Sequence, residues 1–262
     1  MIFYYTSTGN SQWVAEKLEH LLEESIYSIN TIAKDGYSST DFELTEGERI
    51  IFVFPVHSWN VPAVVRKFIS KLSVEGTPSA VYAVCTCGDD CGKTNENLST
   101  MLDLIGLKLN ACFSVQMPNN YVLMPGFNID DPSVQHKKMI EAVTTVEQIA
   151  DKILSGNCDA KGFYTSGTFP WTKSVLLYQY FKRVQCGRTP FKATDACVGC
   201  GLCAQVCPEN NIRMQSNGRP QWRNHCTQCA ACFHHCPKNA VQYGSVTKGK
   251  GQYLNSHVKF DD

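Results

Sequence analysis

The chain has 262 residues, which is long for one compact domain and comfortable for two. Lysine plus arginine and aspartate plus glutamate each number 24, so no overall field favours nucleic acid or an anionic membrane as a partner. Apolar runs stay short of the ~20 residues of a spanning helix, so we expect no membrane span.

Residues 1–155 alternate short apolar runs with segments of helical periodicity, which is typical of a doubly wound α/β sheet. The predicted strands are Ile2–Tyr5, Ile26–Ile32, Ile50–Phe54, Ala80–Cys85 and Ala111–Gln116. The predicted helices are Ser11–Glu24, Pro62–Leu72, Asn95–Ile105 and Pro132–Leu154. Proline at the start of two of these helices suits a first helical turn. Residues 33–49 have weak periodicity and several turn formers, which indicates a short or irregular crossover.

The first strand runs directly into a hydroxyl-rich loop and then into an amphipathic helix. The loop consists of Thr6, Ser7, Thr8, Gly9, Asn10 and Ser11. Its hydroxyls, its glycine and the unpaired amides of a helix N-terminus can hold a phosphate dianion without any lysine. The loop lacks the Gly-Lys-Ser/Thr ending of a Walker loop and the repeated glycines of a dinucleotide fingerprint. Helix N-capping alone is the alternative interpretation.

This loop resembles the FMN phosphate loop of the flavodoxin family, whose pattern is Thr/Ser-x-Thr-Gly-x-Ser/Thr. The resemblance extends over residues 1–155. It implies a flavodoxin-like, doubly wound, five-stranded parallel α/β sheet. In such a sheet FMN lies outside the carboxyl ends of the strands, at the switch point between strands one and three.

The loops after the third and fourth strands carry the remaining contacts that the resemblance implies. Trp59 follows the third strand, where flavodoxins often place a stacking aromatic. The loop after the fourth strand usually offers backbone groups to the pyrimidine edge and N5, but here it has no aromatic. Tyr121 or an open ring face would then complete the site, and interdomain packing is the alternative role of both aromatics. The expected flavin neighbours in these loops are Trp59, Asn60, Thr86, Cys87, Gly88 and Tyr121.

Several polar groups near these loops have competing interpretations. Cys87 and Cys91 lack the Cys-x-x-Cys spacing and electropositive surroundings of a redox-active pair, so we interpret them as loop residues near the flavin. His57 could deliver a proton to reduced flavin, but a hydrogen-bonded structural histidine is the favoured interpretation. Asp89 and Asp90 are expected in a solvated turn.

Residues 156–188 are rich in glycine, serine, threonine and aromatics and are predicted to connect two domains. One helix is predicted here, at Trp171–Val184. We expect its aromatic face to pack on one or both domains. Contact with a partner protein is the alternative.

Residues 189–246 contain one motif twice, Cys-x2-Cys-x2-Cys-x3-Cys-Pro. The eight positions are Cys197, Cys200, Cys203, Cys207, Cys226, Cys229, Cys232 and Cys236. This is the spacing of a bacterial-type ferredoxin domain with two 4Fe-4S clusters, in which the fourth cysteine of each run binds the other cluster. The predicted ligand sets are therefore Cys197, Cys200, Cys203 and Cys236, and Cys226, Cys229, Cys232 and Cys207.

Zinc and disulfides are the alternatives for these cysteines. Structural zinc prefers two Cys-x2-Cys pairs separated by a longer loop. Disulfides need a secreted context, and the N-terminal segment lacks the pattern of a secretory signal. We therefore expect a cytoplasmic protein with reduced thiols and low-oxygen, anaerobic chemistry. His234 and His235 are expected beside a cluster or at the surface.

The cysteine-rich region is predicted to be a small α+β domain. A short strand follows each cysteine run, at Ile212–Met214 and Val241–Tyr243. Between them, Asn217 and Gly218 predict a tight turn. Residues 247–262 lack core periodicity and are predicted to form a C-terminal tail.

As a whole the chain resembles the flavodoxin-ferredoxin fusion proteins, also called iron-sulfur flavoproteins. The resemblance implies an electron-transfer oxidoreductase that passes electrons between two 4Fe-4S clusters and FMN, with no catalytic side chain assigned. One alternative is a ferredoxin-dependent reductase of a small acceptor such as a quinone, a nitro compound or a flavin. The other is a non-enzymatic relay that docks on a larger oxidoreductase.

The same resemblance implies a redox protein as partner, with a small-molecule acceptor as a further candidate. The chain could act as a monomer or a homodimer. No NAD(P) fingerprint is visible, so direct oxidation of nicotinamide is not expected.

Overall fold

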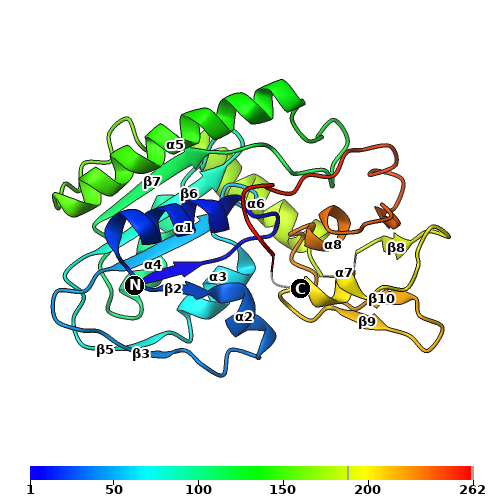
Figure 1. The fold of residues 1–262 in the computed structure, drawn as a ribbon, viewed down its shortest axis with the longest axis horizontal. Coiled ribbons are helices and arrows are strands. Elements are labelled where there is room, and N and C mark those ends of the chain that lie inside the picture. Colours follow the sequence, from blue (N-terminus) through cyan, green and yellow to red (C-terminus); the bar gives the residue numbers. More distant parts are fainter. Residues whose placement is uncertain (188, 261–262) are drawn as a thin grey trace.

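A five-stranded parallel sheet forms the centre of the N-terminal domain. The computed structural model describes residues 1–187 and 189–260. The strands of the sheet are β1 (Ile2–Tyr4), β2 (Ile26–Ser28), β4 (Ile50–Pro55), β6 (Val81–Cys87) and β7 (Ala111–Gln116). Their order is β2-β1-β4-β6-β7 and every neighbouring pair is parallel (Figure 1). The predicted doubly wound, flavodoxin-like sheet is confirmed.

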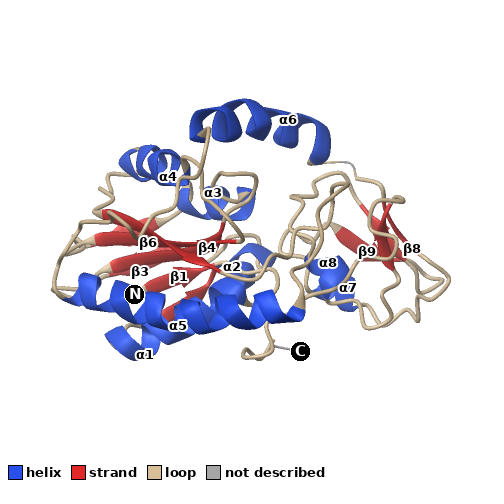
Figure 2. Ribbon diagram, turned by 90° about the horizontal axis from the view of Figure 1, so that it is seen from above, coloured by secondary structure: helices blue, strands red, loops and turns tan. Residues whose placement is uncertain are grey.

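Helices cover both faces of this sheet (Figure 2). The helices α1 (Asn10–Leu22) and α5 (Pro132–Leu154) pack on one face, and α3 (Ala63–Ile69) and α4 (Thr94–Asp103) on the other. Successive strand residues point to opposite faces, so Ile2 belongs to the first core and Phe3 to the second. Both faces are buried, which explains why the strands are continuous apolar runs.

The segment predicted as one strand at Ile26–Ile32 divides into two elements. The strand ends at Ser28, where α2 (Ile29–Lys34) begins, because the Ser28 hydroxyl accepts a hydrogen bond from the Thr31 amide at 3.3 Å. The following crossover contains β3 (Asp41–Glu43), which pairs in parallel with β5 (Ser73–Glu75). This second, two-stranded sheet was not predicted.

The connector forms one helical stretch at the side of α3 and α4 (Figure 2). It consists of η1 (Thr172–Leu177), α6 (Tyr178–Tyr180) and η2 (Phe181–Gln185). Both η segments have the wide turns of a π-helix, which are rare and often occur at functional sites. None of the helices in the described part of the chain is long and apolar enough to cross a membrane.

The cysteine-rich region is built from two short antiparallel sheets of two strands each and two short helices. The strand β8 (Phe191–Ala193) pairs antiparallel with β11 (Val241–Tyr243), and β9 (Ile212–Met214) with β10 (Pro220–Trp222). The helices are α7 (Leu202–Gln205) and α8 (Ala231–His234), one within each cysteine run. Gly218 has a φ of 73°, as the predicted turn between β9 and β10 requires.

The segment after residue 246 returns to the N-terminal domain, as the red trace in Figure 1 shows. The Lys250 ammonium donates to the Val122 carbonyl at 2.6 Å, and the Tyr253 ring is buried. The Gln12 amide donates to the Lys259 carbonyl at 3.0 Å. The tail therefore links the two domains, a role that its composition does not indicate.

Candidate functional site

A cavity of about 440 Å³ lies at the carboxyl ends of β1, β4 and β6. Its size is within the range of small-molecule sites, ~300–1,000 Å³. The connector helix and the cysteine-rich domain close its outer side. The sequence-predicted residues that line it are Thr6, Ser7, Thr8, Asn10, Ser11, Trp59, Thr86, Cys87, Gly88 and Tyr121. Gly9 and Asn60 do not line the cavity.

The hydroxyl-rich loop is held in one shape by its own side chains. The Gly9 amide donates to the Thr6 hydroxyl at 3.0 Å, and the Ser11 and Thr86 hydroxyls lie 2.7 Å apart. Gly9 has a φ of 92°, and a Cβ atom there would lie 2.6 Å from Val258. The position therefore requires glycine.

The first turn of α1 lies at this cavity, because Asn10 and Ser11 line it. The N-cap residue of α1 is Gly9, which has no side chain, and the Thr8 and Ser11 hydroxyls bond to Asn120 and Thr86 rather than to amides of the helix. Capping alone therefore does not account for the hydroxyls, and the donors at the start of the helix are suited to an anion. The loop thus fits the phosphate group of FMN by the chemistry of its donors.

The loop after β4 holds Trp59 at the edge of the cavity. Ser58 and Trp59 both have positive φ, at 49° and 57°. The Ser174 hydroxyl donates to the Trp59 carbonyl at 2.8 Å, and the Lys173 ammonium lies 5.4 Å from the indole centroid. Asn60 shapes the loop instead, because its side-chain oxygen accepts from the Val61 amide at 2.8 Å.

The loop after β6 approaches the cavity through backbone and a neutral thiol. A Cβ at Gly88 would lie 1.6 Å from the Asn119 side-chain oxygen, so only glycine fits there. A hydrogen bond with Cys91, together with burial, raises the pKa of Cys87. Its thiol therefore stays protonated at neutral pH, which does not favour a nucleophilic role.

The connector helix contributes a wall that was not predicted to be part of the site. Its lining residues are Lys173, Leu177, Tyr180, Phe181 and Gln185. Tyr121 lines the cavity as well, and its hydroxyl donates to the Gln185 side chain at 3.4 Å. These rings line the same cavity as the loop after β6, which has no aromatic residue. The aromatic run of the connector was the available signal, but it was interpreted as interdomain packing.

The cysteine-rich domain reaches the same cavity through Gln228, Cys229 and Ala230. Tyr5 and Ser7 are polar neighbours of the Cys229 thiol and act on its pKa. Burial raises the pKa of Cys229. One predicted cluster ligand therefore touches the loop that is predicted to hold FMN.

The eight motif cysteines gather in the two predicted groups. Cys197, Cys200, Cys203 and Cys236 line one small cavity. The other four are electrostatic neighbours of one another, since Cys229 and Cys207 both act on Cys226 and on Cys232. All eight are free thiols. The fold brings the fourth cysteine of each run to the other run, as the ferredoxin pattern implies.

Two histidines join the domains rather than lying at the surface. The His234 Nε2 donates to the Asn120 carbonyl at 2.7 Å, because its Nδ1 accepts from the Tyr253 amide at 3.2 Å. His235 Nε2 lies 3.0 Å from the Ser7 carbonyl. Both side chains are buried. Two cavity-lining loops are thus tied to α8.

His57 lines the cavity and is partly buried. Its ring meets Tyr5 edge-on with centroids 6.0 Å apart, and its Nδ1 is buried without a partner in the described residues. Burial lowers the pKa of His57 to about 4. The imidazole is therefore neutral at pH 7.

This shift makes part of the stability depend on pH. The folded protein keeps His57 neutral while the unfolded chain, with a pKa near 6.5, takes up a proton. The stability from this difference is complete above pH 6.5 and is lost as the pH falls toward 4. Between pH 7 and pH 5 the free energy of unfolding should fall in both proteins. We expect this fall to be roughly 1 to 2 kcal/mol smaller in His57→Gln than in the natural chain, as measured by chemical denaturation. Equal losses in both proteins would contradict the assignment.

The tail is expected to support the hydroxyl-rich loop. The Tyr253 hydroxyl donates to the Asn10 side-chain oxygen at 2.7 Å, and the Asn255 amide donates to the Thr8 carbonyl at 2.8 Å. We expect Tyr253→Phe to weaken FMN binding about fivefold, because about 1 kcal/mol of buried hydrogen bonding is lost. Fluorescence titration of apoprotein with FMN measures this, with Leu254→Ala, a neighbouring exposed position, as control.

Comparisons with known proteins agree with this two-part layout. Residues 1–148 match the model of a family described as a flavodoxin domain, and residues 196–240 match one described as a 4Fe-4S dicluster domain. No curated protein matches the chain.

Several solved structures are similar to the N-terminal part. A flavodoxin of Streptococcus pneumoniae TIGR4 is 14% identical over 59% of this chain and 97% of its own, with a TM-score of 0.36. Rubredoxin oxygen:oxidoreductase of Desulfovibrio gigas is 12% identical over 58% of this chain and 36% of its own, with a TM-score of 0.34. An NAD(P)H:quinone oxidoreductase of Methanothermobacter marburgensis is 11% identical over 56% of this chain and 94% of its own, with a TM-score of 0.34.

Proposed function

The chain belongs to the flavodoxin family and continues into a 4Fe-4S dicluster domain, and on this basis we propose that it passes electrons between two 4Fe-4S clusters and FMN. It thereby couples one-electron carriers to a flavin that accepts or donates electrons. Clusters exchange one electron at a time, whereas FMN exchanges one or two.

One observation carries this proposal: residues of both domains line a single cavity. Thr6, Ser7 and Thr8 come from the flavodoxin domain, and Cys229 comes from the second cysteine run. Cys229 also packs against the core that contains Tyr5, the residue after β1. A flavin in this cavity would adjoin the Cys226 group, which consists of Cys226, Cys229, Cys232 and Cys207. This placement supports electron transfer within one chain.

The residues present fit FMN in the following way. The loop from Thr6 to Ser11 and the free amides of α1 would hold the phosphate. Trp59 and the aromatics of the facing wall, Tyr121 and Tyr180, would flank the ring. The backbone at Gly88 would approach the polar edge of the ring.

The Cys197 group, which consists of Cys197, Cys200, Cys203 and Cys236, is the better candidate for contact with a redox protein partner. Cys200 is exposed, and 62% of the neighbouring Val198 side chain is accessible to solvent. In contrast, the Cys226 group faces the flavodoxin domain. External electrons would therefore enter or leave at the side of the Cys197 group.

Anaerobic purification with iron, sulfide and flavin analysis tests the proposal. We expect about eight iron atoms, about eight sulfides and one FMN for each chain. Zinc without sulfide, or a chain that does not retain FMN, would overturn the cofactor assignment. Redox titration by EPR and absorbance then gives the order of the potentials.

Turnover assays separate the candidate activities. Steady reduction of a quinone or a nitro compound by the isolated protein with reduced ferredoxin would identify a reductase. Flavin oxidation only in the presence of a protein acceptor would identify a relay. NADPH alone is not expected to reduce the flavin, because no nicotinamide fingerprint is visible.

A further inference from the structure

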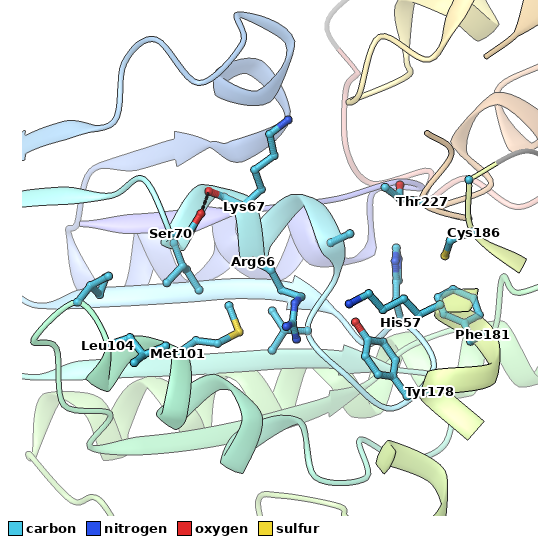
Figure 3. Close-up of a pocket in the computed structure, with 16 residues that line it drawn as sticks. His57, Arg66, Lys67, Ser70, Met101, Leu104, Tyr178, Phe181, Cys186 and Thr227 are labelled. Atoms are coloured by element: carbon cyan, nitrogen blue, oxygen red, sulfur yellow. Dashed lines mark hydrogen bonds between the residues drawn. The ribbon is translucent and has the colours of Figure 1, made fainter. Parts of the chain in front are cut away.

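A second and larger cavity, of about 850 Å³, lies outside the site described so far. It is bounded by α3, by the end of α4 and by the connector helix (Figure 3). Cys186 and Thr227 close one end. The cavity of about 440 Å³ in which we propose FMN is called the flavin cavity below. His57 and Phe181 line both this second cavity and the flavin cavity, so they form a common wall.

The charge in this cavity is positive and largely uncompensated. Arg66 and Lys182 line it, and neither forms an ion pair within the described residues; the guanidinium only donates to the Asn60 side chain at 3.4 Å. Lys67 differs, because its ammonium lies 3.5 Å from the Glu209 carboxylate. In Figure 3 its side chain points away from Arg66 and Tyr178. The described lining contains no carboxylate.

The remaining lining combines polar groups with an apolar surface. Tyr178 lines the cavity as well, and the positive charge of Arg66 acts on its hydroxyl. The Nδ1 of His57 is buried and without a partner in the described chain, so a ligand in either adjoining cavity could satisfy it. Ile69, Met101 and Ile105 are apolar, and Leu104 stands 83% exposed at the rim.

We propose that this cavity binds a small organic anion, with its carboxylate between Arg66 and Lys182 and its apolar body against Met101 and Ile105. Two unpaired cations without a nearby acid favour an anion, and a guanidinium pairs well with a planar carboxylate. The apolar surface beside these two cations favours a ligand whose remaining part is apolar. This site goes beyond the proposed electron transfer and does not depend on FMN.

Calorimetric titration of the full chain with 2-naphthoate tests the charge requirement. We expect the neutral analogue 2-naphthamide to bind at least about tenfold more weakly than the carboxylate. Arg66→Gln and Lys182→Gln should each weaken 2-naphthoate about tenfold. Lys71→Gln removes an exposed cation that does not line the cavity, and it should leave the affinity unchanged. Equal binding of acid and amide, or unchanged affinity in both cavity variants, would overturn the proposal.

Substitution at the exposed rim keeps the test independent of folding. Leu104→Glu should weaken 2-naphthoate severalfold, and Leu104→Lys should strengthen it, because these charges stand at the mouth of the cavity. The same affinity in both rim variants would refute binding in this cavity. Titration of protein without FMN should give the same values. Competition between 2-naphthoate and FMN for the apoprotein would place 2-naphthoate in the flavin cavity and overturn the assignment.

Discussion

Replacing Thr8 by glutamate is expected to leave the protein without FMN while its iron content stays unchanged. The Thr8 side chain is only 2% exposed and lies at the start of α1, and its hydroxyl accepts a hydrogen bond from the Asn120 side chain at 2.6 Å. A carboxylate here would occupy the positive end of the helix and repel a phosphate dianion. We expect the affinity for FMN to fall by a factor on the order of a thousand.

Thr8→Gln is the matched control, because glutamine has nearly the same size without the charge. Its loss of FMN affinity should be much smaller than that of Thr8→Glu. Flavin fluorescence during reconstitution gives the affinity, and iron analysis shows that the cysteine-rich domain has folded. A Thr8→Glu protein that purifies with a full complement of FMN would refute the phosphate loop.

Serine substitution of one cysteine from each group is expected to remove one cluster in either case. Iron should fall from about eight to about four atoms for each chain in Cys229→Ser and in Cys200→Ser. The two variants should differ at the flavin. Cys229 lines the cavity in which we propose FMN, together with Ser7, whereas Cys200 is exposed and does not line it. Only Cys229→Ser should change the absorbance spectrum of bound FMN.

Cys158 provides the control for this pair, because it is an exposed free cysteine outside both motifs. Cys158→Ser should keep all iron and an unchanged flavin spectrum. Full iron content in either motif variant would exclude that cysteine as a ligand. Equal spectral changes in both would contradict the placement of the Cys226 group beside the flavin.

The sheet and its helices were largely predictable, because each element carries its own periodic pattern. The predicted bounds of β7 and α5 agree with the structure at both ends. The error at Ile26–Ile32 has a local cause, since a serine cap competes with strand propensity there. The pairing of β3 with β5 joins segments about thirty residues apart, and neither has an apolar run that would reveal it.

The connector and the tail show what single segments cannot reveal. The aromatic residues Tyr180 and Phe181 suit either interdomain packing or the wall of a binding site, and only their position in the cavity at the carboxyl ends of the strands distinguishes these roles. Likewise, the hydrogen bond from Tyr253 to Asn10 joins residues at opposite ends of the sequence. No pattern within the tail can predict a contact whose partner lies in another domain.

The sequence by itself predicts the chemistry of this protein, which is cluster ligation and FMN binding. Cysteine spacing and the hydroxyl-rich loop are local features, because cluster ligation and phosphate binding each need a few residues at short, fixed separations. The tertiary structure decided which cysteine group faces the cavity at the carboxyl ends of the strands, which segments line its outer side, and that Arg66 and Lys182 line one common cavity. These depend on how two domains and a connector pack, and packing joins residues whose separation in the chain leaves no local signal.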